Sequence, residues 1–465
     1  MKTGGDPHFV LPYTTQIAQR LEEPTLALHW YEWQQGPDPS PEARYKFDTH
    51  YPDYFPARTD FKTAVAGLLK INVSTFPYIN GRISDVQSDS FIKDEAHVYC
   101  SKETSPKMVN PHNPEPLKPY VESYGSGSTF CVTNPFTAYW QDKTADIVEQ
   151  LVFEYGVSGV YIDQIGSAVP KLCWDAVHEH SLGNGDFWTV GYEKMLTAIN
   201  DRLVSTSARP MVTEDNAEPY MESIQGYLTL NAYKHSFAAS PDGALASTSH
   251  MAPAFPMVYG GYYVGFGAIW SRADFNDHNF WCGKLASMFV TGSQLGWFSL
   301  AGIANDPDDS CGPMGVGDLM LSADNDDLIA YLRLLARSRA AGIDYFLHGH
   351  MIRPAVVNPV PPALIYSLSS SEQYDYDSLA SSVYKLEDKN TVLAVFTTTT
   401  LTSYEGDLKV NFSNWGFPSD CKLVVWSVSS SSEKIQLGTI YGPSAVWPLS
   451  VPARSVVMLE FTVVL

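Results

Sequence analysis

The stretch GVSGVYIDQIG, residues 156–166, decides the fold because a short apolar strand ends in it at a single carboxylate. Strands of parallel sheets that are covered by helices on both faces read as runs of apolar residues. Here the run VYI stops and Asp163 follows directly. In barrels of alternating strands and helices, catalytic groups lie at the C-terminal ends of the strands. The pattern therefore predicts that Asp163 lies at the mouth of such a barrel.

Strands and helices alternate on both sides of this stretch. Helical spacing of apolar residues predicts helices over 136–155, 186–204, 277–291 and 324–341, the last followed by Gly342. Eight strands are expected, near residues 28, 75, 130, 160, 212, 228, 258 and 296. This alternation predicts an α/β fold of the (β/α)8 TIM barrel type. A doubly wound open sheet is the alternative, although no GxGxxG motif follows an early strand.

Changes in composition and in the hydrophobic pattern divide the chain into three parts. Residues 1–24 are expected to be an N-terminal lead-in, and residues 25–350 the catalytic barrel. A long excursion interrupts the barrel at about 84–128, where Pro, Ser and Asn abound; loops of this length are usually functional. After that, residues 351–465 consist of short alternating runs, which predict a C-terminal antiparallel β-sandwich.

Composition and charge exclude several classes of partner. The chain has 465 residues, 45% hydrophobic and 17% charged, and no apolar run approaches the ~18 residues of a membrane span. Its net charge of −21 repels phosphate backbones, so we expect no nucleic acid and no membrane partner. The N-terminus MKTGGDPHFV lacks the apolar centre of a signal peptide. We therefore expect a cytoplasmic protein, or a secreted one whose targeting segment has been trimmed.

A second carboxylate follows the next predicted strand. In PMVTEDN, residues 210–216, the apolar run ends at Val212, and Glu214 and Asp215 come after it. Because neighbouring parallel strands end at the same edge, Asp163 and Glu214 are expected to be close in space. Two carboxylates at a barrel mouth are the minimum apparatus for glycoside hydrolysis, and their separation decides between retention and inversion. The alternative is that each carboxylate caps a helix or pairs with an arginine.

These segments resemble a known group of barrel enzymes. GVSGVYIDQIG and MVTEDNAE, preceded by HWYEW and PYINGR, are similar to barrel proteins related to retaining α-glycosidases, most nearly the endo-α-N-acetylgalactosaminidase type of glycoside hydrolase family 101. The resemblance spans roughly residues 20–345. It implies that Asp163 is the nucleophile, that Glu214 is the general acid/base, and that an α-linkage is cleaved with retention. The chain is shorter than that family's multidomain enzymes, which suggests that an N-terminal β domain is missing.

Aromatic and polar side chains near the other strand ends complete the expected sugar-binding pocket. Tyr, Phe and Trp make up 13% of the chain, and exposed aromatic faces suit the apolar faces of sugar rings. For each single position, a place in the core is an equally good interpretation. The expected substrate-binding residues are His29, Trp30, Glu32, Asn80, Arg82, Asp85, Gln164, Asp215, Tyr233, Lys234, Tyr259, Trp270 and Trp297.

Other chemistries have weaker support in the sequence. The pairs His178/His180 and His348/His350 have metal-ligand spacing, but an amidohydrolase barrel needs such a pair at its first strand, so we expect no catalytic metal. The acidic run 305–310, with Asp306 and Asp309, lacks the EF-hand pattern for calcium. No GxSxG motif supports serine catalysis, and no cofactor is implied. Six dispersed cysteines leave one or two long-range disulfides open.

The sequence thus predicts a glycoside hydrolase with a carbohydrate substrate. Two alternatives stay open: a carbohydrate-binding protein on a barrel without catalysis, and a sugar isomerase or lyase. The latter needs a lysine or a metal near the mouth, and Lys234 is the candidate.

Overall fold

The structure is a computed structural model that describes residues 1–22, 25–35, 49–103, 117–124, 127–206, 210–229, 253–300, 315–369 and 372–464. The chain divides into two units. The first comprises Met1–Ala18, Pro24–Leu228 and Ser299–Gly315, and the second comprises Gln19–Glu23, Thr229–Phe298 and Val316–Leu465. We describe each unit by itself.

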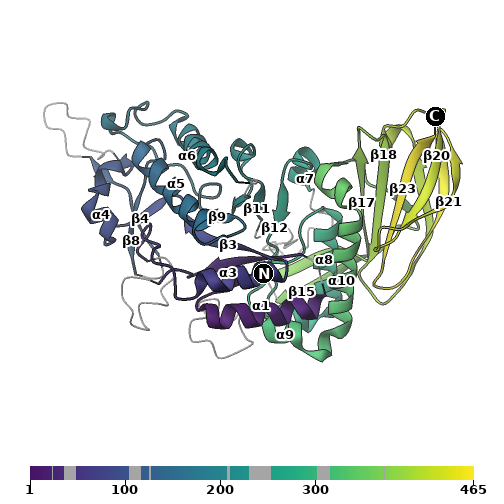
Figure 1. The fold of residues 1–465 in the computed structure, drawn as a ribbon. Coiled ribbons are helices and arrows are strands. Elements are labelled where there is room, and N and C mark those ends of the chain that lie inside the picture. The colour runs from purple at the N-terminus through teal and green to yellow at the C-terminus, as the bar shows by residue number, and fades with distance from the viewer. Residues whose placement is uncertain are drawn as a thin grey trace. The chain divides into compact units, whose positions relative to one another are not determined.

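A curled parallel sheet, a half-barrel, is the centre of the first unit (Figure 1). Its strands lie side by side in chain order, and each pairs in parallel with the next. Such a sequential order is that of a barrel wall, because a doubly wound sheet reverses its strand order at a switch point. The strands are β1 (Lys2–Gly4), β2 (Leu26–Tyr31), β3 (Val73–Asn80), β9 (Val160–Asp163), β10 (Met211–Glu214) and β11 (Gly226–Leu228).

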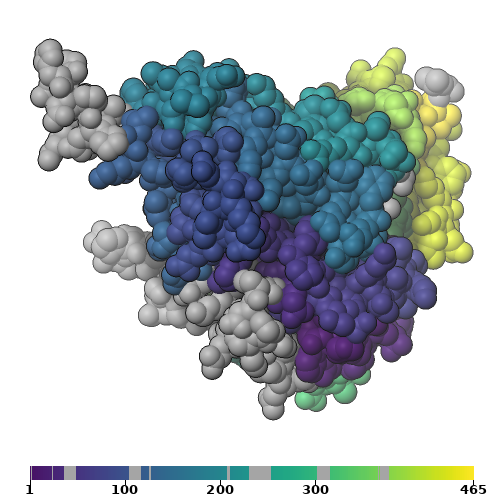
Figure 2. All heavy atoms as spheres, turned by 60° about the vertical axis from the view of Figure 1, so that its left-hand side comes forward, coloured from purple at the N-terminus to yellow at the C-terminus, as the bar shows by residue number. Residues whose placement is uncertain are grey.

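Helices cover the outer face of this sheet. Trp30 of β2 is fully buried and contacts Phe61 of helix α3 edge to face at 4.9 Å. Helices α5 and α6 pack side by side, and Arg202 of α6 pairs with Asp142 and Asp146 of α5 (Figure 1). In the space-filling view, the purple to teal segments of this unit pack against one another (Figure 2). The helices are α1 (Pro7–Leu21), α3 (Phe61–Lys70), α4 (Asp89–Lys93), α5 (Ala138–Phe153) and α6 (Phe187–Leu203), with 3-10 turns at Ala96–Tyr99, Ala176–His178 and Glu218–Tyr220.

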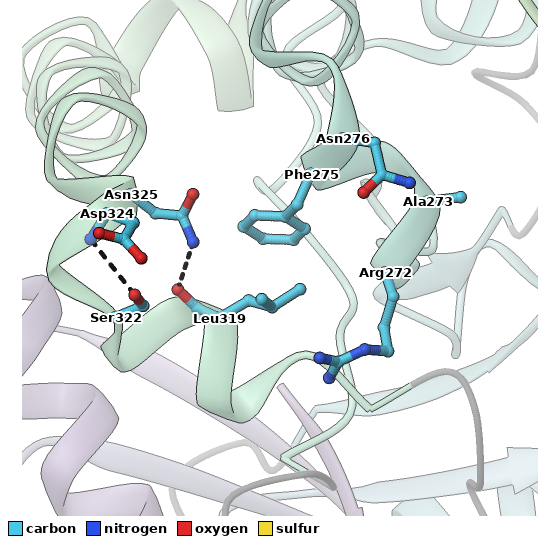
Figure 3. A pocket seen from close by; sticks show the side chains of 8 residues that line it. All are labelled: Arg272, Ala273, Phe275, Asn276, Leu319, Ser322, Asp324 and Asn325. Carbon is cyan, nitrogen blue, oxygen red and sulfur yellow. Dashed lines mark hydrogen bonds between the residues drawn. The ribbon is translucent and has the colours of Figure 1, made fainter.

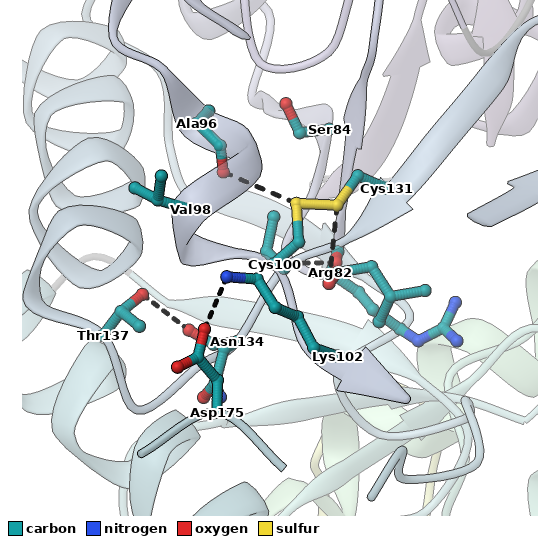
Figure 4. Close-up of a disulfide and its surroundings, with 12 residues drawn as sticks. Arg82, Ser84, Ala96, Val98, Cys100, Lys102, Cys131, Asn134, Thr137 and Asp175 are labelled. Atoms are coloured by element: carbon teal, nitrogen blue, oxygen red, sulfur yellow. Dashed lines mark hydrogen bonds and ion pairs between the residues drawn. A yellow bond between two sulfur atoms is a disulfide. The ribbon is translucent and has the colours of Figure 1, made fainter. Parts of the chain in front are cut away.

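The expected excursion at about 84–128 has regular structure of its own. Strands β4 (Ile83–Asp85), β8 (Thr129–Val132) and β7 (Val121–Ser123) form an antiparallel sheet in that order. A second small pair consists of β5 (Lys102–Glu103) and β6 (Lys118–Pro119). A disulfide joins Cys100 to Cys131 of β8, so a long-range disulfide of the kind that the sequence left open is present (Figure 4).

The closed eight-stranded barrel is not what the described residues form: one expected strand belongs to another sheet, and two expected strands are absent. The strand near 130 is β8, which belongs to the antiparallel sheet. The run near 258 lies in helix α7 (Ala254–Tyr259), because a short apolar run does not distinguish helix from strand. Near residue 296 the structure has an isolated parallel β-bridge between Ile269 and Trp297 in place of the expected strand. Conversely, β1 lies inside the expected N-terminal lead-in. The parallel sheet thus contains β1 in the place expected for the strand near residue 130, and Asp163 and Glu214 still end its fourth and fifth strands.

The second unit begins with helices. The periodicity over 277–291 and 324–341 is confirmed by α8 and α10, and Gly342 follows α10 as expected. Asp326 and Asp327 occupy the first turn of α10, where negative charge stabilises the helix dipole. The elements are α7, β12 (Val264–Phe266), a 3-10 turn at Arg272–Asn276, α8 (His278–Val290), α9 (Gly317–Leu321), a 3-10 turn at Ala323–Asn325, α10 (Asp326–Ala341) and α11 (Ile343–His348).

Antiparallel sheets make up the rest of the second unit, as the alternating runs predict (Figure 1). A six-stranded sheet has the order β13-β17-β18-β23-β20-β21, and β14, β19 and β22 form a three-stranded one. One core of buried side chains, among them Trp415 and Phe461, includes residues of both sheets. The strands are β13 (His350–Met351), β14 (Val356–Asn358), β15 (Ala363–Ser369), β16 (Glu372–Asp377), β17 (Leu379–Leu386), β18 (Thr391–Thr398), β19 (Tyr404–Asn411), β20 (Lys422–Val428), β21 (Lys434–Tyr441), β22 (Ser444–Val451) and β23 (Val456–Val464), with a 3-10 turn at Ser413–Trp415.

Among the residues that the structure describes, every helix is too short or too polar to cross a lipid bilayer.

Candidate active site

Asp163 and Glu214 lie at the same level of two neighbouring strands. In the register of β3 and β9, Asn80 is opposite Asp163. In the register of β9 and β10, Val212 is opposite Tyr161, so Glu214 is level with Asp163 two residues further on. Adjacent strands are about 4.8 Å apart, and laterally paired residues point to the same face. The two carboxylates therefore share one face at the C-terminal ends of β9 and β10.

Two tyrosine hydroxyls hold the Asp163 carboxylate. The hydroxyl of Tyr78 donates to Oδ2 at 2.7 Å, and that of Tyr161 donates to Oδ1 at 3.0 Å. Asp163 is only 9% exposed. Burial, and then the negative charge of Asp163, raise the pKa of Tyr161 well above its ordinary value, so this phenol stays protonated and donates. The carboxylate is thus fixed in orientation by a neutral donor on each oxygen.

An aromatic layer lies under Asp163. The ring of His29 is 4.0 Å from that of Tyr161 and 4.4 Å from that of Tyr31, and the rings of Tyr31 and Tyr78 are 4.7 Å apart. These four residues come from β2, β3 and β9. The sequence analysis missed Tyr31, Tyr78 and Tyr161. Strand alternation is the signal for two of them, because Tyr78 and Tyr161 stand two residues before Asn80 and Asp163 and so share their face.

Glu214 has a different environment from Asp163. It is half-buried, and the Ser167 hydroxyl donates to its Oε2 at 2.7 Å. Ser167 lies in the loop after β9, so this hydrogen bond links the two strand ends. A neutral hydroxyl stabilises a carboxylate less than a cation does. The Ser167 hydroxyl is thus a neutral donor to Glu214.

Two glycines permit the close approach of these strand ends. A Cβ on Gly81 would lie 2.5 Å from Cγ2 of Ile165, and a Cβ on Gly166 would lie 2.6 Å from the carbonyl oxygen of Glu214. The backbone N–H of Gly81 donates to the carbonyl of Asp163 at 3.1 Å. Any side chain at Gly81 or Gly166 would push the two catalytic candidates out of place.

Arg82 and Gln164, both expected substrate-binding residues, belong to a polar network with the excursion. The guanidinium of Arg82 donates to both oxygens of Glu122 at 2.7 Å and to Oε1 of Gln164 at 3.3 Å. Gln164 in turn donates to the Tyr124 hydroxyl at 3.2 Å. The hydrogen bond from Arg82 is the main cause that lowers the pKa of Glu122 to about 2. Arg82 thus fixes β7 beside the end of β9.

Asn80 and Asp85 are engaged in local hydrogen bonds. Oδ1 of Asn80 accepts from the backbone N–H groups of Arg82 and Ile83, at 2.9 and 3.1 Å. Its Nδ2 donates to the hydroxyl of Tyr78 at 3.3 Å, so Asn80 touches the network that holds Asp163. The carboxylate of Asp85 accepts backbone N–H groups of residues 50 and 87. Asp85 therefore stabilises the turn that directly follows β4.

The other expected substrate-binding residues of the first unit lie in different surroundings. Trp30 is buried on the helix side of the sheet, whereas His29 lies in the aromatic layer. Glu32 is buried directly after β2, with a left-handed φ of 52°. Asp215 is exposed, and its backbone N–H donates to the carbonyl of Leu228 at 3.0 Å.

Three expected residues that the structure describes lie in the second unit. Tyr259 is half-buried on α7, and its ring is 4.8 Å from that of Phe255. Trp270 is buried and stacks on Phe298 at 4.9 Å, and Trp297 is buried as well. Tyr233, Lys234 and the acidic run 305–310 fall outside the described residues.

The second unit also contains a pocket of about 380 Å³ (Figure 3). The amide of Asn325 donates to the carbonyl of Leu319 at 2.9 Å across its wall. None of the residues expected from the sequence lines it. Its lining residues are Arg272, Ala273, Phe275, Asn276, Leu319, Ser322, Asp324 and Asn325.

Two curated proteins resemble this chain. It is 41% identical over 399 residues to a protein of Monosiga brevicollis named "Putative glycoside hydrolase 22789", a match that covers 85% of this chain and 32% of that protein. It is 28% identical over 350 residues to a Bacteroides thetaiotaomicron protein named "Putative glycoside hydrolase", covering 74% of this chain and 44% of that protein. The chain thus spans less than half the length of these relatives.

Solved structures share the fold. The α-amylase of Geobacillus thermoleovorans, solved as a complex with acarbose, superposes with a TM-score of 0.56 over 98% of this chain and 92% of that chain, at 12% identity. Neighbours of this type are TIM barrels with a C-terminal β domain. At this identity the likeness shows the fold alone.

One family model matches residues 2–270, which is more than half of the chain and includes the strands that carry Asp163 and Glu214. The chain therefore belongs to the family described as a domain of unknown function, DUF6259.

Proposed function

We propose that this chain is a glycosidase that cleaves an α-glycosidic linkage with retention, with Asp163 as nucleophile and Glu214 as general acid/base. One observation carries the proposal: the two carboxylates stand level on one face at the C-terminal ends of adjacent parallel strands. The names of the two relatives support glycoside hydrolysis. The α-linkage, the retention and the family 101 type come from the sequence resemblance.

In the first half of the reaction, Asp163 attacks the anomeric carbon while Glu214 protonates the departing oxygen. The C–O bond to the leaving group breaks, and a glycosyl ester to Asp163 forms. The tyrosine hydroxyls on Asp163 keep one carboxylate oxygen aimed at the sugar, which lowers the orientational cost of attack.

In the second half, Glu214 acts as a carboxylate. It takes a proton from water, and the resulting hydroxide attacks the anomeric carbon and releases Asp163. The Ser167 hydroxyl stabilises Glu214 in this ionised state and holds its orientation when the proton is present. Two displacements on opposite faces of the sugar restore the starting configuration.

A panel of α- and β-linked aryl glycosides tests the proposal. We expect the purified chain to release the aryl group from α-linked substrates, and Asp163→Asn and Glu214→Gln to lose at least about 10³-fold in kcat. Asp201→Asn, on the outer helix α6 and exposed, is the matched control and should keep its activity. NMR of the first sugar released should show the α anomer. A β anomer would contradict retention.

Chemical rescue separates the two carboxylates. With azide present, Asp163→Ala should form a β-glycosyl azide, because the small nucleophile attacks from the side that Asp163 vacates. Glu214→Ala should keep activity only on substrates whose leaving group needs no proton. If wild type and both variants bind the same glycans equally and none turns them over, the alternative of a carbohydrate-binding protein replaces the hydrolase.

A further inference from the structure

Three metal-ligand side chains meet in the loop between β9 and α6. The Sγ of Cys173 and one ring nitrogen each of His178 and His180 lie within 4.8 Å of one another. Cys173 and His178 are buried, and His180 is half-buried. The sulfur is 3.3 Å from Nδ1 of His178. One thiol with two imidazoles is a ligand set typical of zinc and other borderline transition metals.

Hydrogen bonds on the far side of each ring determine which nitrogen faces this cluster. Nε2 of His178 is 2.7 Å from the carbonyl oxygen of Val98, and Nδ1 of His180 is 2.9 Å from that of Ser181. A carbonyl only accepts, so each of these nitrogens carries the proton. The lone pairs therefore belong to Nδ1 of His178 and Nε2 of His180. Metal-bound histidines are oriented by the same kind of outer hydrogen bond.

The sulfur of Cys173 is held in the same way. The backbone N–H of Lys102 donates to Sγ at 3.4 Å, which stabilises negative charge on sulfur. Cys173 and Gly183 exchange two backbone hydrogen bonds, so the loop is closed around the cluster. Lys102 also pairs with Asp175, and it lies beside the Cys100–Cys131 disulfide (Figure 4).

The amide of Asn134 marks the point where the lone pairs converge. Its Nδ2 is 3.0 Å from Nδ1 of His178 and 2.8 Å from Nε2 of His180. Its Oδ1 accepts the backbone N–H of Phe136 at 3.0 Å, which fixes the orientation of the amide. Two N–H groups with partial positive charge thus stand where a cation would be bound.

We propose that Cys173, His178 and His180 form a binding site for a divalent transition metal of the zinc type. Binding replaces the thiol proton, which leaves to solvent, by a sulfur–metal bond, while both imidazoles bind as neutral rings. The metal is an anchor for the loop and takes no part in catalysis. That loop also contains Ser167, the hydrogen-bond donor to Glu214. The sequence analysis weighed His178 and His180 for a catalytic metal alone and did not connect them with Cys173.

Cobalt is the probe, because a Co²⁺ ion bound by thiolate has a charge-transfer absorption and a tetrahedral site adds strong visible bands. After chelation, the full chain should bind one Co²⁺ with both signals, and Zn²⁺ should displace it. Cys173→Ser should lose the charge-transfer band, and His180→Ala should weaken Co²⁺ binding at least about 100-fold. Cys421→Ser is the control, since this half-buried thiol lies in the second unit.

A substitution at Asn134 distinguishes a metal site from a hydrogen-bond cluster. Asn134→Asp adds a carboxylate ligand but removes both donors to the histidines. A metal site predicts that this variant binds Co²⁺ at least as tightly as wild type and unfolds at a higher temperature when the metal is present. If wild type shows no charge-transfer band at one equivalent of Co²⁺, or if the band survives in Cys173→Ser, there is no such site. None of these readouts depends on glycosidase activity.

Discussion

At the scale of single residues, the buried carboxylate of Asp163 accepts hydrogen bonds from phenols on neighbouring strands. Tyr78 and Tyr161 donate one hydrogen bond to each oxygen. Neutral donors keep the carboxylate oriented and still available for attack.

Tyr78→Phe removes one of these donors with little change in shape. A hydrogen bond to a charged group contributes about 1.5 to 3 kcal/mol, so kcat/KM should fall by roughly 10- to 100-fold. The acid limb of the kcat/KM profile against pH should also move to higher pH, because the carboxylate is less stabilised. Tyr262→Phe, exposed in the second unit, should change neither. An unshifted profile in Tyr78→Phe would mean that this hydrogen bond does not support Asp163.

Glu122 gives a prediction for stability against pH. Its pKa is lowered to about 2 in the folded protein, chiefly by the hydrogen bond from Arg82. A lowered folded pKa means that the pair stabilises the protein above the ordinary pKa of a glutamate, and that this contribution is lost as pH falls toward 2. Urea titrations at pH 7 should show Glu122→Gln to be less stable than wild type, and the difference should shrink as the pH is lowered from about 4.5. A constant difference would exclude this ion pair as the cause.

At the scale of elements, the ends of β9 and β10 were predicted with success because the signal is local. Each strand begins with a short apolar run, which ends at Ile162 directly before Asp163 in β9 and at Val212, two residues before Glu214, in β10. The same local reasoning failed at β1, whose three residues KTG have no apolar pattern. It also failed at 254–259, where Phe, Met, Val and Tyr suit helix and strand alike. Contacts made by loops, such as Ser167 to Glu214, leave no periodic trace in a sequence.

Gly81→Ala tests how closely these strand ends must pack. The added methyl group would lie 2.5 Å from Ile165 and 2.7 Å from Ile162, so the end of β3 must move away from β9. Overpacking of this kind costs about 1 to 3 kcal/mol of unfolding free energy, and kcat should fall as Asp163 is displaced. Gly67→Ala in α3 is the matched control, because the nearest atoms are the flexible end of Leu11 at 3.2 Å. Equal behaviour of the two variants would argue against a special role for Gly81.

At the scale of the whole molecule, composition and texture predicted an α/β part followed by antiparallel sheets, and both are present. The sequence predicted a closed barrel, whereas the described residues form a half-barrel; local patterns do not reveal closure, because closure depends on how the late strands pair. The aromatic layer was missed because buried tyrosines such as Tyr31, Tyr78 and Tyr161 do not differ in sequence from ordinary core residues. Their hydroxyls become functional only through the register of three strands.

Trp415→Ala should separate stability from catalysis. Trp415 is 2% exposed in the core shared by the antiparallel sheets, and its ring is 5.1 Å from that of Phe461. Its truncation should cost about 3 to 5 kcal/mol of unfolding free energy. Because Asp163 and Glu214 belong to the other unit, kcat/KM at 25 °C should stay within about twofold of wild type. A large loss in kcat/KM with intact folding would show that the second unit contributes to turnover.

The strand order of the parallel sheet has a consequence for synthesis on the ribosome. Because β1, β2, β3, β9, β10 and β11 neighbour one another in the order in which they are made, each strand can join an edge that already exists. A pairing with the strand made just before joins segments that are nearer in the chain than a pairing with any earlier strand would, and contacts between nearer segments form faster. The parallel sheet can therefore form strand by strand during synthesis, before the later part of the chain has been made. Asp163 reaches its tyrosine partner on β3 as soon as β9 emerges, and Glu214 is added one strand later.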